Sequence, residues 1–216
     1  MKKYYPVNLD VMDKRCVIVG GGAVAERKVE RLLECGARVI VVSLKLTPML
    51  EDRKKAGCIE HIDADYETQM LGAAFMVIGA TDCDDVNAQV SQDARALGLL
   101  VNIVDDPVKC NFILPSLVQR GDLSIAVSTA GKSPALARKI REDLQQLYGP
   151  EYESLLAIMG AIRKRILAHG KASDTNKAVF EALVHSDMLQ AIREGNAEKV
   201  KQIILDLCGI DMDVNL

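Results

Sequence analysis

The first hundred residues alternate between short apolar runs, rich in β-branched residues, and longer stretches in which apolar residues recur at helical spacing. Each apolar run is continuous, which is typical of strands buried on both faces of a parallel sheet. Strand, helix and strand follow one another with short connections, an order that predicts right-handed βαβ units in an open α/β sheet. The expected strands are Cys16–Val19, Arg38–Val42, Phe75–Ile78 and Leu99–Val104, and the expected helices are Val24–Cys35, Thr47–Ala56 and Val86–Leu97.

The pattern changes after Asp105. Two apolar runs, Phe112–Val118 and Leu123–Val127, are separated by a Gly-Asp turn signal, which predicts an antiparallel hairpin. Pro115 lies within the first run and cannot donate to a sheet ladder, so we expect that strand to be bulged or at an edge.

Helices are expected for the remainder of the chain. Ser133 is a good N-cap and Pro134 suits the first helical position, so a helix should run from there to about Leu147. The segment from Glu151 to Cys208 contains no strand-like run and predicts three or four further helices. Their breaks are expected at His169-Gly170, His185-Ser186 and Gly195-Asn196.

Composition excludes several classes of protein. Apolar residues form 49% of the 216 residues but aromatic residues only 4%, with no tryptophan, so the core should be aliphatic. A formal charge of −3, from 27 basic and 30 acidic residues, argues against a general nucleic-acid binder. The apolar runs are too short to span a membrane, and no signal-peptide core follows the N-terminal lysines. The six cysteines form no CxxC pair and fit packed thiols, so we expect a cytoplasmic protein.

A glycine-rich turn follows the first expected strand and opens the first expected helix. Gly20-Gly-Gly22-Ala-Val-Ala25 matches the pattern G-x-G-x-x-G/A. Gly20 permits a tight turn, Gly22 lets the backbone approach a pyrophosphate, and Ala25 allows close packing of helix on strand. Because the start of a helix favours phosphate, the motif predicts a dinucleotide site. The alternative is a glycine turn that serves packing alone.

The ends of the next two expected strands supply further candidate cofactor contacts. Ser43-Leu44-Lys45 stands where an acidic residue is expected to bind the adenosine ribose. Ser43 can hydrogen-bond a 2′-hydroxyl, whereas Lys45 can meet a 2′-phosphate; since no arginine follows the strand, we expect NAD. Thr81 and Asp82 follow the third strand, where they can line the cofactor crevice or cap the next helix.

Candidate chemistry lies at the next strand end and in a basic segment. Asp105 lies on the same expected sheet edge as the glycine turn, where its carboxylate can act as a base or hold a substrate. The alternative is a turn formed by Asp105-Asp106-Pro107. Residues 109–141 contain six basic residues and one acid, and Ser128-Thr129-Ala-Gly-Lys132 leads there into the capped helix. This segment suits a polycarboxylate, or it is an ordinary N-cap beside a solvated basic face.

No metal site is expected. None of the three histidines, His61, His169 and His185, lies in sequence near the strand ends that carry the glycine turn or Asp105. No cluster of His, Cys and Asp has metal-ligand spacing, and no GxSxG, Cys–His or P-loop motif supports a hydrolase or kinase.

Several motifs together resemble the precorrin-2 dehydrogenase family, which is also the N-terminal module of multifunctional siroheme synthase. The resemblance covers residues 1 to about 150 with order and spacing intact. It rests on VGGGAVAERK (19–28), GATD (79–82), NIVDDP (102–107), FILPS (112–116) and AVSTAGKSPALAR (126–138). The resemblance implies NAD-dependent oxidation of precorrin-2, a tetrapyrrole with eight carboxylates, to sirohydrochlorin by a homodimer.

The resemblance also assigns roles to residues. Asp105 matches the essential aspartate of the family, and Ser128 and Thr129 match a hydroxyl pair near the tetrapyrrole. The cofactor should contact Gly20, Gly22, Ala23, Val24, Ser43, Leu44, Lys45, Thr81 and Asp82. The substrate should contact Asn102, Ser128, Thr129, Lys132 and Arg138.

The expected organisation is an NAD-binding Rossmann domain at 1–111, a dimerisation segment of hairpin and helix at 112–150, and a helical C-terminal domain at 151–216. Some relatives also insert Fe²⁺ into sirohydrochlorin. Because no histidine lies at the strand ends, dehydrogenase activity alone is favoured over a bifunctional enzyme. The alternative of another class is a non-catalytic NAD-sensing regulatory module, which would not explain Asp105 and the basic segment.

Overall fold

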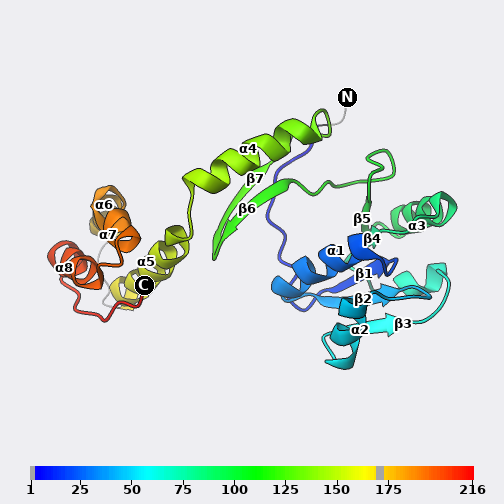
Figure 1. The fold of residues 1–216 in the computed structure, drawn as a ribbon, viewed down its shortest axis with the longest axis horizontal. Helices are drawn as coiled ribbons and strands as arrows, with labels where there is room; N and C mark the ends of the chain where they lie inside the picture. The colour runs from blue at the N-terminus through cyan, green and yellow to red at the C-terminus, as the bar shows by residue number, and fades with distance from the viewer. Residues whose placement is uncertain (1–2, 169–172) are drawn as a thin grey trace. The chain divides into compact units, whose positions relative to one another are not determined.

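A five-stranded parallel sheet with the order β3-β2-β1-β4-β5 organises the first half of the chain (Figure 1). The computed structural model describes residues 3–168 and 173–216, and the chain divides into two units at Leu114 and Pro115. The strands are β1 (Arg15–Val19), β2 (Arg38–Val42), β3 (Ile59–Ile62), β4 (Met76–Gly79) and β5 (Leu100–Ile103).

Helices cover both faces of this sheet. The sheet residues Ile18, Val41 and Ile78 pack with α1 (Ala23–Glu34) and α2 (Pro48–Lys55) in one apolar layer. The alternate residues Val17 and Val77 pack with α3 (Asp84–Ala96) and the short 3₁₀ helix η1 (Thr68–Leu71) in the other. Burial on both faces explains the continuous apolar runs, and the predicted parallel α/β sheet is confirmed.

One strand of the sheet was missed by the sequence pattern. β3 reads Ile-Glu-His-Ile, with polar Glu60 and His61 between its two apolar residues. It pairs only with β2, at the edge of the sheet, and therefore lacks the two-sided burial that marks the central strands. The short helix η1 was not expected either, and the other strands and the α-helices of this unit lie within two residues of their expected bounds.

The second unit begins with a hairpin and a helix. β6 (Ser116–Arg120) pairs with β7 (Leu123–Val127) in antiparallel register, as predicted. Pro115 lies just before the first paired residue, Ser116, so β6 begins after the proline, which lacks an N–H, and its pairing is regular rather than bulged. Because its sheet has two strands, β6 is an edge strand, as the proline predicts. α4 (Pro134–Leu147) begins as predicted, with the Ser133 hydroxyl accepting a hydrogen bond from Leu136 N at 3.2 Å.

The remainder is helical, as predicted, with α5 (Glu151–Ala168), α6 (Ser173–His185), α7 (Met188–Arg193) and α8 (Ala197–Cys208). Their aliphatic core includes Ile162, Leu183 and Ile204. The expected breaks at 185–186 and 195–196 are confirmed, and the one at His169-Gly170 lies outside the described residues. Among the described residues, no helix has both the length and the apolarity needed to cross a bilayer. All six cysteines are thiols.

Candidate cofactor and active site

The carboxyl ends of four parallel strands meet at one edge of the sheet. Val19 at the end of β1 pairs with Val42 of β2 and with Gly79 of β4, and Gly79 pairs with Ile103 of β5. The loops that follow these residues are therefore neighbours. This edge brings together the glycine-rich turn, the candidate cofactor residues after β2 and β4, and Asp105, as the sequence predicts.

A different structural feature explains the glycine at each of the three consecutive positions of the turn. Gly20 has a φ of +119°, a conformation that residues with a Cβ rarely adopt. A Cβ at Gly21 would lie 2.0 Å from the carbonyl oxygen of Lys45 and 2.4 Å from the Ser43 hydroxyl. A Cβ at Gly22 would meet no heavy atom of the described structure within 4 Å, apart from its chain neighbours.

Gly22 is therefore not explained by packing within the protein. Its φ of −86° and ψ of −176° are accessible to any residue. It is the N-cap of α1, where no side chain caps the first-turn N–H groups of residues such as Ala23 and Val24. An open approach to uncapped N–H groups at the positive end of a helix fits the pyrophosphate of a dinucleotide. Ala25 is fully buried, as close helix–strand packing requires.

The loop after β2 is folded against this turn. The Ser43 hydroxyl donates to the carbonyl oxygen of Lys45 at 2.8 Å, so toward a ribose Ser43 can act only as an acceptor. Leu44 and Lys45 are exposed. His61 Nε2 lies 2.9 Å from the Ser43 carbonyl oxygen, a contact that sequence separation concealed because it depends on the pairing of β2 with the missed strand β3.

The loop after β4 is held by a buried amide. Asn87 Nδ2 donates to the Thr81 carbonyl oxygen at 2.9 Å, and Asn87 Oδ1 accepts from the Thr81 hydroxyl at 3.1 Å. The N-cap of α3 is Cys83, without a side-chain cap, so the alternative role of Thr81 and Asp82 as a helix cap is wrong. Contact of these two residues with the cofactor stays a prediction.

The two aspartates after β5 have different environments. Asp106 Oδ1 accepts from Val108 N at 3.1 Å and from Lys109 N at 3.3 Å, and its carboxylate pairs with Lys109 Nζ at 2.9 Å. The hydrogen bond from Lys109 holds the pKa of Asp106 below its usual value. Asp105 is exposed and has a φ of +60°. Asp106 thus builds the turn that the sequence suggested, while Asp105 is presented at its surface.

The Asp105 carboxylate acts electrostatically on a lysine of α1, Lys28. Burial and the neighbouring Arg27 lower the pKa of Lys28, whereas attraction to the Asp105 carboxylate opposes that shift. Lys28 is half-buried, so its charge is screened less than a solvent-exposed one. The sequence pattern indicates no role for Lys28, although Lys28 is the last residue of the VGGGAVAERK motif.

Asn102 lies within the framework of β5. Its side chain is buried, and Nδ2 donates to the Phe112 carbonyl oxygen at 3.2 Å. The amide nitrogen therefore holds the segment that follows Asp105. Contact of Asn102 with a substrate stays a prediction.

In the second unit, the expected hydroxyl pair divides into two roles. The Thr129 hydroxyl donates to the Ser133 carbonyl oxygen and accepts from Ser133 N, each at 3.1 Å, which fixes the turn into α4. Ser128 is exposed, and its hydroxyl accepts from Ala130 N at 3.2 Å, so its proton can be donated to a ligand.

The basic segment also divides. Lys109 and Lys139 pair with Asp106 and Asp143, and Arg120 and Arg141 hydrogen-bond neighbouring groups of their own unit. Lys132 and Arg138 are exposed and form no ion pair with an acidic side chain of residues 3–168 and 173–216. These two are the basic residues that sequence reasoning assigned to the substrate. In the same described ranges, no group of three or more His, Cys, Asp and Glu side chains is arranged to hold a metal ion.

Comparisons with known proteins identify the family of the chain. The family model "Putative NAD(P)-binding" matches residues 7–116, about half of the chain, and "Sirohaem biosynthesis protein central" matches residues 120–147. Siroheme synthase 1 of Aeromonas salmonicida is 37% identical over 201 residues, covering 93% of this chain and 43% of the relative. Siroheme synthase 2 of Yersinia enterocolitica is 34% identical over 205 residues, covering 94% of this chain and 43% of the relative.

A solved structure shares the whole fold. SirC, a precorrin-2 dehydrogenase, superimposes with a TM-score of 0.77 at 23% identity, covering 92% of this chain and 100% of its own. The chain spans less than half the length of the siroheme synthases that it matches. The resemblance inferred from the motifs is confirmed, and NAD fits the matched family. The chain belongs to the putative NAD(P)-binding family and joins that domain to the central region of sirohaem biosynthesis proteins.

Proposed function

We propose that this chain is an NAD-dependent dehydrogenase that oxidises precorrin-2 to sirohydrochlorin. The observation that carries the cofactor assignment is Gly22, whose missing Cβ leaves open space at an uncapped helix start. The name of the structural neighbour SirC, a precorrin-2 dehydrogenase, suggests the substrate, and the siroheme synthase relatives suggest the pathway. NAD, when bound, would supply the hydride acceptor for this oxidation. The protein must then bind both molecules, orient them and receive the proton released from the macrocycle.

In this proposal, Asp105 is the base. Its carboxylate is exposed at the sheet edge that carries the glycine turn. Proton transfer to a positioned carboxylate is worth roughly 10²–10⁴ in rate. The N–H groups of Ala23 and Val24 at the start of α1 bind the pyrophosphate, and Ser43 accepts a hydrogen bond from the ribose. Gly20, whose N–H donates to the Val42 carbonyl oxygen at 2.8 Å, shapes the turn that brings them to the cofactor.

The second unit supplies the groups that recognise the substrate's carboxylates. Lys132 and Arg138 are exposed cations without an acidic partner among the described residues, and Ser128 retains a hydroxyl proton. A tetrapyrrole with eight carboxylates suits such groups, because charge-assisted hydrogen bonds are the strong ones.

We also propose that residues 112–150 mediate a homodimer in the cytoplasm. The hairpin has only the strands β6 and β7, and α4 leaves the apolar side chains of Leu136, Ile140 and Leu147 exposed. A two-stranded sheet is marginal on its own, and a second copy could cover this apolar face. In analytical sedimentation, the wild type should be a dimer and L136K/I140K a monomer.

The test of function is anaerobic incubation of the purified chain with precorrin-2 and either NAD or NADP. The proposal expects NADH and sirohydrochlorin to appear together, with NAD preferred. Binding of NAD without any NADH would favour the regulatory-module alternative. A parallel incubation of sirohydrochlorin with Fe²⁺ or Co²⁺ tests the bifunctional alternative, for which a protein-dependent metallation spectrum would be required.

A further inference from the structure

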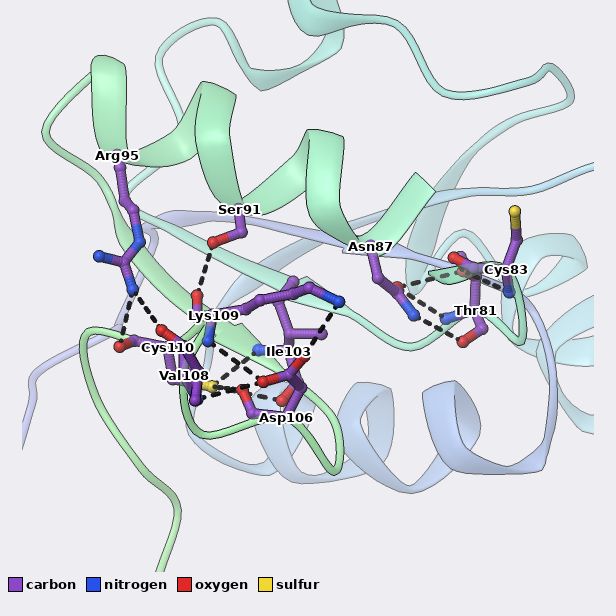
Figure 2. A network of polar contacts seen from close by, with 10 residues as sticks. All are labelled: Thr81, Cys83, Asn87, Ser91, Arg95, Ile103, Asp106, Val108, Lys109 and Cys110. Carbon is purple, nitrogen blue, oxygen red and sulfur yellow. Dashed lines mark hydrogen bonds and ion pairs between the residues drawn. The ribbon is translucent and has the colours of Figure 1, made fainter. Parts of the chain in front are cut away.

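One face of α3 carries three polar residues at intervals of four: Asn87, Ser91 and Arg95 (Figure 2). Residues at this spacing lie above one another on a helix. Asn87 and Ser91 are only 6% and 4% exposed, on the face that packs against the sheet. Buried polar groups are costly unless they are hydrogen-bonded. The hydrogen-bond partners of these three residues therefore show which loops the helix keeps in place.

The first turn of α3 holds the loop after β4. Asn87 donates to the Thr81 carbonyl oxygen at 2.9 Å and accepts from the Thr81 hydroxyl at 3.1 Å. Thr81 N also donates to Asn87 Oδ1, at 3.4 Å. Both hydrogen-bonding ends of the amide are therefore used on one residue of the candidate cofactor loop.

The later turns of α3 hold the loop after β5. The Ser91 hydroxyl donates to the Lys109 carbonyl oxygen at 2.6 Å. Arg95 Nη2 donates to the carbonyl oxygens of Val108 and Cys110, each at 3.0 Å. These are three successive carbonyl groups of the loop, and the contacts fix its course over three residues (Figure 2).

The loop is in turn tied to the end of β5. Cys110 Sγ accepts from Ile103 N at 3.1 Å and lies 3.1 Å from the Asp106 carbonyl oxygen. Asp105 lies between these anchor points with its φ of +60°. A non-glycine residue in this conformation needs its surroundings to hold it there. The groups that hold it are on this loop and on α3.

We propose that Asn87, Ser91 and Arg95 are positioning residues that set the cofactor loop and the Asp105 loop from one rigid helix. Asn87 acts through Thr81 on the bound cofactor, and Ser91 and Arg95 act through the Asp105 loop on the proton transfer. This inference rests on the proposed dehydrogenase function. Its consequence is that substitutions along one helix separate cofactor affinity from turnover.

The experiment compares Asn87→Ala and Arg95→Met with Gln92→Ala, an exposed residue of the same helix that serves as the matched control. Asn87→Ala should raise the Kd for NAD, measured by titration without substrate, by roughly tenfold and leave kcat at saturating NAD within about twofold. Arg95→Met should leave that Kd within about twofold and lower kcat by roughly 10- to 100-fold, since a displacement of about 1 Å can cost that much. Arg95→Lys should restore part of kcat, and Gln92→Ala should change neither quantity.

A double variant separates the inference from the proposed function. In the background of Asp105→Asn, Arg95→Met should lower the residual turnover by less than about twofold, because Arg95 acts through the missing carboxylate. Equal slowing in both backgrounds, or an unchanged kcat in Arg95→Met, overturns the inference. Full turnover of Asp105→Asn alone instead overturns the proposed role of Asp105. Thermal unfolding of each variant shows whether a loss of turnover or of NAD affinity comes from unfolding. If Arg95→Met does not fold, Arg95→Lys takes its place in the comparison.

Discussion

The position of a Cβ at Gly21 lies 2.0 Å from the carbonyl oxygen of Lys45, whereas the adjacent Gly22 faces open space. Gly21 is thus needed for the loop after β2 to close on the turn. The hydrogen bond from Thr47 N to the Gly21 carbonyl oxygen, at 3.0 Å, reinforces that closure. Two neighbouring glycines of one motif therefore serve the fold and the ligand respectively, and substitutions can separate these roles.

Gly22→Ala should abolish tight NAD binding while preserving the fold. The added methyl meets no described atom but occupies the space through which the pyrophosphate would approach the helix start. We expect an unchanged melting temperature and a Kd for NAD raised by roughly 100-fold. Isothermal titration and thermal unfolding check the two expectations.

Gly21→Ala is the matched comparison. Its methyl would collide with backbone, so the variant should lose about 2 kcal/mol or more of folding stability, as overpacked sites do. Urea unfolding measures the loss. Equal stability of the two variants would contradict the division of roles between Gly21 and Gly22.

Asp105→Asn should lower turnover strongly, but not to zero, without unfolding the protein. Because the Asp105 side chain is exposed and Asp106 supplies the carboxylate of the turn, we expect kcat to fall roughly 10²–10⁴-fold at an unchanged Kd for NAD. Asp106→Asn is the control, and it should lower the melting temperature because the pair with Lys109 is lost. Near-normal turnover of Asp105→Asn would exclude Asp105 as the base.

Lys132→Met and Arg138→Met should weaken substrate binding. Each removes an exposed cation available for a substrate carboxylate, so KM for precorrin-2 should rise roughly tenfold and depend less on salt. Lys139→Met, whose lysine already pairs with Asp143, should have little effect. If all three substitutions raise KM equally, the change in net charge explains the effect, and the proposed contacts of Lys132 and Arg138 with the substrate are contradicted.

Asp93 should contribute to the acid sensitivity of the fold. Burial raises its pKa, but hydrogen bonds from Thr68, Tyr66 and Gln89 outweigh burial, so the folded-state pKa lies below the usual value. A depressed folded-state pKa adds stability above the unfolded-state pKa, and that stability is lost as the pH falls through the folded-state pKa. The free energy of unfolding, measured with urea between about pH 2 and 6, should therefore fall more steeply with decreasing pH in the wild type than in Asp93→Asn. Parallel curves would contradict this role.

Much of the fold was predictable because its signals are local. Continuous apolar runs marked the central strands, and Ser133-Pro134 marked the start of α4. β3 was missed because an edge strand can contain polar residues such as Glu60. The sequence also showed the strand ends that carry Gly22 and Asp105.

The supporting contacts of the site were not predictable. Asn87, Ser91 and Arg95 acquire their meaning only when α3 packs beside loops that lie up to 15 residues away in sequence. Asp105 likewise influences the pKa of Lys28 only because α1 packs on the sheet. Asp105 exposes its carboxylate, whereas Asp106 uses its carboxylate to form the turn. This difference depends on backbone geometry, which two adjacent aspartates in a sequence do not reveal.

The most direct test of the proposed function is the stoichiometry of a single turnover under anaerobic conditions. Enzyme in excess over precorrin-2, with saturating NAD, should form one NADH for each sirohydrochlorin that appears, with the two spectra rising at one rate. At an NAD concentration that just saturates the wild type, Gly22→Ala should form both products far more slowly, because little of the variant then holds the cofactor. Formation of sirohydrochlorin without NADH, or binding of NAD and precorrin-2 without any redox change, would contradict the account.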